Sequence, residues 1–278
     1  MRRFLCRSVG ALAMLATLFT TPAYSHETIK IGSIGAAAGM MKTVSREFEK
    51  HHRTIKVKVL PIPDPSGGIQ AVSENAIDIG VTSRSLRGDE KKRGLVAVLF
   101  ARTPLTPVSN RDVAIKGLKT HELVSIYQGK TLKWPNGKQV RLIMRPAAET
   151  DMQLIRKISP EMRAAVDNAL SRPGMNMART DQDNLKKLER VSGAVGFATL
   201  SQVLSEGRSV SPLAFNGLAP SVEAVAKGRY PVVKSFYFVR KKDPSPEERA
   251  FIAFLLSAKG RKILKEAGCA PAPGAPAR

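Results

Sequence analysis

Two short polar clusters in this sequence carry residue types suited to binding an oxyanion. The first, Thr82-Ser83-Arg84-Ser85, directly follows an alternating apolar stretch over 77–81, which predicts a buried strand. The second begins at Arg145, also after a predicted strand, and ends at Thr150. A guanidinium presents paired N–H donors to an oxyanion, and hydroxyl groups add further donors. The alternatives are an ordinary turn for the first cluster, and a solvated arginine followed by a helix cap for the second.

Alternating strands and helices must position these clusters. The first third of the sequence predicts strand, helix, strand, helix and strand, over 28–31, 41–50, 55–59, 69–75 and 77–81. This order is typical of a parallel sheet with crossover helices. Ligands on such sheets bind at the carboxyl ends of strands, where helix N-termini direct backbone N–H groups at them. Both clusters and the segment from Gly32 to Gly39 lie at junctions of this kind.

Proline spacing predicts where the chain passes between two lobes. Pro104 and Pro107 lie close together, so they exclude a helix and favour a stiff extended crossing. A second crossing strand is predicted over 230–239. We therefore expect an α/β protein with two lobes, each a mostly parallel sheet flanked by helices, joined by two hinge strands. The predicted division is lobe 1 at 26–107, lobe 2 at 108–231, the C-terminal part of lobe 1 at 232–269 and a disordered tail at 270–278.

The first 25 residues are typical of a cleaved bacterial export signal. Three arginines precede an apolar run over 9–19 that is too short to span a bilayer, and Ala23-Tyr24-Ser25 provides the small residues of a cleavage site. We expect cleavage after Ser25 and a periplasmic protein. Cleavage removes Cys6, so Cys269 is left without a disulfide partner. It also lowers the formal charge from +22 by three, to +19.

Composition and motifs argue against several classes of function. A strongly positive chain attracts anions, but aromatic residues are only 5% of this one, too few for nucleic-acid stacking platforms. The sequence contains no Ser-His-Asp set, phosphate-binding P-loop or HExxH motif. Asp181-Gln182-Asp183-Asn184 lacks the glycine and distant glutamate of a calcium loop, and predicts the start of a helix. We expect no enzyme activity, cofactor, metal or nucleic-acid partner.

Several segments, in this order, resemble the periplasmic phosphate-binding proteins of bacterial ABC importers. The similar segments cover most of the chain after residue 25. They read "IKIGSIG", "PSGGIQAVSENAIDIGVTSRSL", "KGLKTHELVSIYQGKTLKWP", "RPAAET", "GAVGFATL" and "GRYPVVKSFYFV". The resemblance implies two α/β lobes that hold a phosphate-like ligand in the cleft between them. The ligand-binding residues it implies are Ser33, Ser83, Arg84, Arg145, Glu149 and Thr150.

The sequence departs from the family at some ligand positions. Ala36 and Ala37 stand where the family's first loop carries hydroxyl groups, and Ala148 stands where its third loop carries serine. Glu149 replaces a glycine, and a carboxylate beside a bound dianion is costly in a dry cleft. Glu149 therefore either points away from the ligand, accepts a hydrogen bond from a protonated ligand, or indicates a ligand that carries a donor or positive group.

The function expected from these observations is capture of a small oxyanion for an ABC-type importer. We expect a monomer that closes its two lobes on the ligand and delivers it to a permease in the inner membrane. The alternative is a periplasmic regulatory or envelope protein of the same fold without a transport role, which binds another ligand or anionic surface polymers. The alanines and Glu149 favour this alternative.

Overall fold

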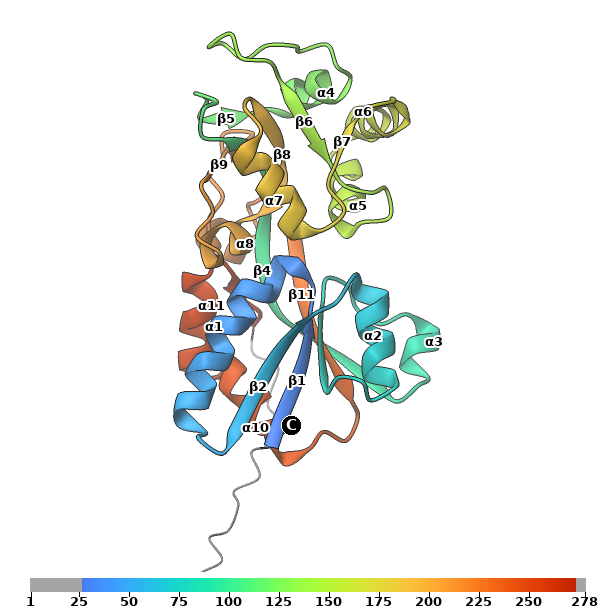
Figure 1. The fold of residues 1–278 in the computed structure, drawn as a ribbon, viewed down its shortest axis with the longest axis vertical. Helices are drawn as coiled ribbons and strands as arrows, with labels where there is room; N and C mark the ends of the chain where they lie inside the picture. The colour runs from blue at the N-terminus through green and yellow to red at the C-terminus, as the bar shows by residue number, and fades with distance from the viewer. Residues whose placement is uncertain (1–26, 274–278) are drawn as a thin grey trace, which may run out of the picture.

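The protein folds into two α/β lobes joined by two long strands, as Figure 1 shows. The computed structural model describes residues 27–273, so the expected export signal lies outside the described residues. Among the described residues, no helix combines the length and the apolar character needed to cross a membrane. The arrangement of the lobes confirms the predicted fold class.

The first lobe is built from both ends of the chain. β1 lies between β2 and β3 and pairs in parallel with both, which confirms the predicted crossover arrangement. In chain order its elements are β1 (Glu27–Ser33), α1 (Gly35–His51), β2 (Ile55–Pro61), α2 (Pro65–Ser73), β3 (Ile79–Thr82), α3 (Gly88–Lys91), α10 (Pro246–Leu256), α11 (Ala258–Glu266) and β12 (Ala270–Pro271).

The second lobe is built from the middle of the chain. Its β6 pairs in parallel with β7 and β8, and the short β5 pairs with β10. In chain order its elements are β5 (Gly117–Leu118), α4 (Thr120–Tyr127), β6 (Arg141–Met144), α5 (Thr150–Arg156), α6 (Pro160–Ser171), β7 (Asn176–Met177), α7 (Asp181–Arg190), β8 (Ala194–Thr199), α8 (Leu200–Ser205), β9 (Val210–Pro212), β10 (Ala214–Phe215) and α9 (Val222–Ala226).

Two antiparallel strands, β4 (Leu95–Asn110) and β11 (Val233–Lys241), connect the lobes (Figure 1). β11 pairs with the first part of β4, from Lys241 opposite Leu95 to Val233 opposite Pro104. The second part of β4 pairs with β8 in the other lobe. β4 stays extended through both of its internal prolines, as their spacing predicts.

Each lobe has its own hydrophobic core. Ala101 of β4 packs in the core of lobe 1 with α1, α10 and α11, whereas Leu105 of the same strand packs in the core of lobe 2 with α4, α5 and α6. The change of lobe therefore lies between these two residues of β4. The predicted boundaries at 107/108 and 231/232 fall close to it and stay a prediction.

The expected disordered tail is wrong for residues 270–272. Ala270 and Pro271 form β12, which pairs antiparallel with β4, and the Ala272 amide donates to the Phe100 carbonyl over 2.9 Å. The Arg261 guanidinium donates in turn to the Ala272 carbonyl. These backbone bonds order a segment whose composition alone predicts disorder. The neighbouring Cys269 is fully buried, and burial raises the pKa of its thiol to about 12.

Candidate functional site

A cavity of about 550 Å³ lies between the two lobes. Lobe 1 contributes the end of β1, the start of α1 and the end of β2 with the loop that follows, while lobe 2 contributes the segments before α5 and α7. One wall is apolar, formed by Val59, Leu60, Ile62 and neighbouring prolines. The polar and charged residues that line the cavity include Ser33, Lys42, Ser83, Arg145, Glu149, Asp181 and Lys234.

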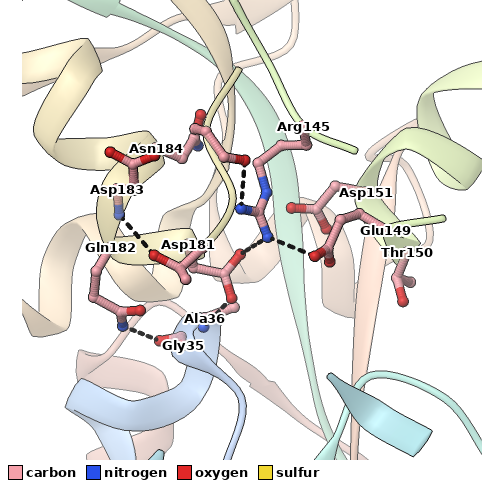
Figure 2. A network of polar contacts seen from close by, with 12 residues as sticks. Gly35, Ala36, Arg145, Glu149, Thr150, Asp151, Asp181, Gln182, Asp183 and Asn184 are labelled. Atoms are coloured by element: carbon pink, nitrogen blue, oxygen red, sulfur yellow. Dashed lines mark hydrogen bonds and ion pairs between the residues drawn. The ribbon is translucent and has the colours of Figure 1, made fainter. Parts of the chain in front are cut away.

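Arg145 is the central cation of this cavity (Figure 2). It follows β6, and its residue surface is only 4% exposed. One guanidinium nitrogen donates to the Ala178 carbonyl over 3.0 Å. The other lies 3.2 Å from Glu149 Oε1 and 3.3 Å from Asp181 Oδ1. A buried guanidinium held in this way is a fixed positive charge with defined donor directions, which suits an oxyanion.

Glu149 lies in the cavity beside Arg145, so it does not point away from the expected ligand position. Burial raises the pKa of the Glu149 carboxyl above its ordinary value. Arg145 opposes this effect, whereas the negative charges of Asp181 and Asp151 add to it. A carboxyl group with a raised pKa can gain or lose its proton when a charged ligand enters the cavity, and it can then donate or accept a hydrogen bond.

A second buried ion pair joins the two lobes next to this arginine. Lys234 Nζ of β11 lies 2.6 Å from Asp151 Oδ1 of α5, and both side chains are less than 5% exposed. Burial works to lower the pKa of the Lys234 ammonium group, but the carboxylates of Asp151 and Asp181 outweigh it, so the pKa lies above its ordinary value. Lys234 therefore stays charged and adds a second buried cation to the cavity wall.

Hydroxyl groups from both lobes meet at the same edge of the cavity. Ser83 Oγ of lobe 1 and Thr150 Oγ1 of lobe 2 lie 2.9 Å apart and share a hydrogen bond. Ser33 is buried, and its hydroxyl donates to the Ile34 carbonyl over 3.0 Å. Ser33 and Ser83 line the cavity, whereas Thr150 does not. Thr150 was also a candidate helix cap, but it is the first residue of α5 and its hydroxyl bonds across the lobes instead.

The predicted role of Arg84 as a ligand-binding residue is wrong in this arrangement. Its two terminal nitrogens donate to both carboxylate oxygens of Glu90, over 2.7 and 2.8 Å. They also donate to Ser66 Oγ and to the Ser85 carbonyl. Arg84 does not line the cavity. Its donors are used to hold the β3–α3 turn against α2, which is the ordinary-turn alternative.

Four charged residues that line the cavity were not predicted as site residues: Lys42, Asp64, Asp181 and Lys234. Lys234 lies on the same face of β11 as Phe236 and Phe238, so a lysine in a buried period-2 pattern was an available signal. Asp181 begins α7 as predicted, and Thr180 caps that helix by accepting from the Asp183 amide. The Asp181 carboxylate, however, reaches across to lobe 1, and no local pattern indicates that contact.

Comparison with known proteins places this geometry in a family. A family model described as a PBP superfamily domain matches residues 20–259. The chain belongs to this family. The phosphate-binding protein PstS of Bacillus subtilis is 25% identical over 214 residues, which are 73% of this chain and 67% of that protein. The resemblance to phosphate-binding proteins predicted from the sequence is thereby confirmed.

Two solved structures illustrate the shared fold. A candidate phosphate ABC transporter substrate-binding protein from Clostridium perfringens, with bound phosphate, has a TM-score of 0.73 at 21% identity and covers 89% of this chain and 100% of its own. The periplasmic molybdate-binding protein of Azotobacter vinelandii has a TM-score of 0.61 at 15% identity, with 87% and 98% covered. Both likenesses show the two-lobed fold and leave the ligand to be argued from the site.

Proposed function

We propose that this protein captures a small oxyanion, phosphate or a phosphate-like ligand, between its lobes and delivers it to an ABC-type importer in the inner membrane. Residues 1–25 would direct export to the periplasm, where a binding protein of this kind works. The family is one of transporter binding proteins, and its relatives include a phosphate-binding protein, so neither an enzyme nor the regulatory alternative is favoured.

The buried guanidinium of Arg145 is the observation that carries this proposal. It faces a cavity that is also lined by the N-terminal turn of α1, a 17-residue helix whose positive dipole end favours an anion and whose Ala36 amide donates to the Asp181 carboxylate. Ser33 and Ser83 add hydroxyl donors from lobe 1, and Lys234 adds a second buried cation. An oxyanion in the cleft would contact donors from both lobes at once, which favours the closed arrangement.

Glu149 would select for a protonated ligand. Its carboxylate lies in the cavity, and a hydrogenphosphate can donate a proton to it, whereas sulfate has no proton to donate at neutral pH. A carboxylate facing an unprotonated anion would instead add repulsion in a partly buried site. We therefore expect phosphate to bind more tightly than sulfate by about tenfold or more, the equivalent of one charge-assisted hydrogen bond.

Isothermal titration calorimetry of the purified protein with phosphate, sulfate and methylphosphonate tests this proposal. Binding of phosphate with one site per chain, and weaker binding of sulfate, is the expected result. A matched thermal-shift series with the same anions should show stabilisation in the same order, because a ligand that binds only the native state raises the unfolding temperature. Absence of heat and of any thermal shift at millimolar anion would overturn it.

A further inference from the structure

Asp181 places a carboxylate of the protein itself where an oxyanion of the proposed kind would bind. It is the first residue of α7 in lobe 2, yet its Oδ2 atom accepts from the Ala36 amide of α1 in lobe 1 over 2.9 Å (Figure 2). Its Oδ1 atom lies 3.3 Å from the Arg145 guanidinium and accepts from it. One carboxylate thus uses a helix N-terminal amide and the central cation together.

The contact across the lobes is close and depends on glycine. Gln182 Nε2, the next side chain of α7, donates to the Gly35 carbonyl over 3.2 Å. A Cβ atom on Gly35 would lie 2.5 Å from the Gln182 side-chain oxygen and 2.7 Å from Asp181 Cβ. Since real Cβ atoms do not approach other atoms so closely, only glycine lets α7 reach the start of α1.

The charges around Arg145 show why this carboxylate matters for an entering ligand. The two buried cations, Arg145 and Lys234, already face three carboxylates, those of Glu149, Asp151 and Asp181. Glu149 and Asp151 each hold one cation, whereas Asp181 bridges Arg145 and the α1 amide. A ligand that adds negative charge must therefore replace one of the three, and Asp181 occupies the donors that an oxyanion needs.

We propose that Asp181 is an internal anion that determines specificity: a ligand must displace its carboxylate from the Ala36 amide and Arg145 to bind. This inference rests on the proposed function of the cleft. A monocarboxylate offers the same two acceptor atoms that Asp181 already provides, so it gains nothing by displacing it. A tetrahedral oxyanion that takes over both Asp181 contacts has further oxygens, which can accept from Ser33 and Ser83 in the cavity wall once these hydroxyls turn from the Ile34 carbonyl and Thr150. The cleft therefore binds phosphate-type anions and excludes simple carboxylates.

Replacement of Asp181 tests the inference with and without a ligand. Thr180 still caps α7 in Asp181→Ala, so the helix start is kept. Without any ligand, hydrogen exchange at the Ala36 amide should be slow in the wild type and at least about tenfold faster in Asp181→Ala, because its acceptor is lost. Acetate should slow that exchange again in the variant, since it replaces the deleted carboxylate, and should have no effect on the wild type.

Titration completes the test. Phosphate should bind Asp181→Asn at least about tenfold more tightly than the wild type, since the competing charge-assisted bond to Arg145 is gone. Asp183→Asn is the matched control, because it removes the same charge from the same helix turn but its carboxylate pairs with Lys187 outside the cavity. It should leave both the affinity and the Ala36 exchange unchanged.

The outcomes separate this inference from the proposed function. If Ala36 exchange depends on Asp181 and acetate restores protection, the internal anion is supported even if phosphate fails to bind either form, and only the proposed function falls. If phosphate binds the wild type and Asp181→Asn equally, or more weakly in the variant, the internal-anion proposal is wrong and the proposed function stands. Unchanged exchange at Ala36 in Asp181→Ala would also overturn it.

Discussion

Arg84 and Arg145 each follow a strand at the lobe interface, yet only one of them faces the cleft. Arg84 is held by Glu90, six residues further on, in a paired contact that uses both terminal nitrogens. Arg145 meets Glu149 and Asp181 at longer distances, inside the cavity and from two different elements. An arginine held by a well-oriented carboxylate outside the cavity stabilises a turn, whereas one whose carboxylates line the cavity with it can exchange them for a ligand.

The largest effect is expected from removing the cavity arginine. Arg145→Gln should weaken phosphate binding by about 10–100-fold, because it removes charge-assisted donors that contribute about 1.5–3 kcal/mol each. Calorimetric titration measures this loss, and circular dichroism checks that the variant folds. Arg84→Gln is the matched control, and its affinity should stay within about twofold of the wild type. Equal losses in both variants would show that the two arginines do not differ as described.

The turn arginine should instead affect stability. Arg84→Gln should lower the free energy of unfolding by about 1–3 kcal/mol, because it breaks a paired charge-assisted contact with a largely buried carboxylate. Urea unfolding of the variant and the wild type measures this difference.

The dependence of stability on pH below 4.5 gives a further test of the Arg84–Glu90 pairing. The Arg84 guanidinium holds the pKa of the Glu90 carboxyl at about 2, below its ordinary value of 4.5. A lowered carboxyl pKa contributes stability that is present above pH 4.5 and is lost as the pH falls toward 2. The difference in free energy of unfolding between the wild type and Arg84→Gln should therefore become smaller as the pH falls from 4.5 to 2. A gap that is constant between pH 4.5 and 2 would contradict the assigned pairing.

Local patterns were sufficient for most of the fold. Asp181-Gln182-Asp183-Asn184 predicts the start of a helix, and α7 does begin at Asp181, with Thr180 as its cap. Pro104 and Pro107 predict an extended crossing, which is β4. Such signals succeed because a cap or a proline acts on its own few residues.

The site was predictable only where a residue and its role lie on one element. Arg145 and Ser83 follow predicted strands and line the cavity, as does Glu149, which only the family resemblance made a candidate. Their roles in ligand binding stay predictions. The role of Asp181 depends on contact between α7 and the start of α1. Asp181 and its partner Ala36 are 145 residues apart in sequence. Arg84 was assigned to the cavity because its pattern does not reveal that the chain turns back and brings Glu90 to it. Contacts made by tertiary folding have no period or spacing that a single sequence displays.

The smallest effect is expected from the carboxyl that lies beside the cavity arginine. Burial raises the pKa of Glu149, so the folded protein holds a proton on this carboxyl more tightly than the unfolded chain does. A raised carboxyl pKa contributes stability that is complete below pH 4.5 and is lost as the pH rises through the raised value. Glu149→Gln imitates the protonated form and lacks this loss. The unfolding temperature of the variant should therefore rise relative to that of the wild type as the pH rises from 4 to 8.

The size of this change in unfolding temperature and the choice of a control depend on the surroundings of Glu149 and of Glu161. Because Glu149 is partly solvated, the gain should be about 1–2 °C. Glu161→Gln is the control: the Ser159 side chain and a backbone N–H lower the pKa of Glu161, so its contribution to stability is already complete above pH 4.5. Its difference from the wild type should therefore stay nearly constant from pH 4.5 to 8. If both variants followed the same trend, Glu149 would behave as a solvated surface carboxylate, and the cavity beside Arg145 would be less enclosed than its contacts indicate.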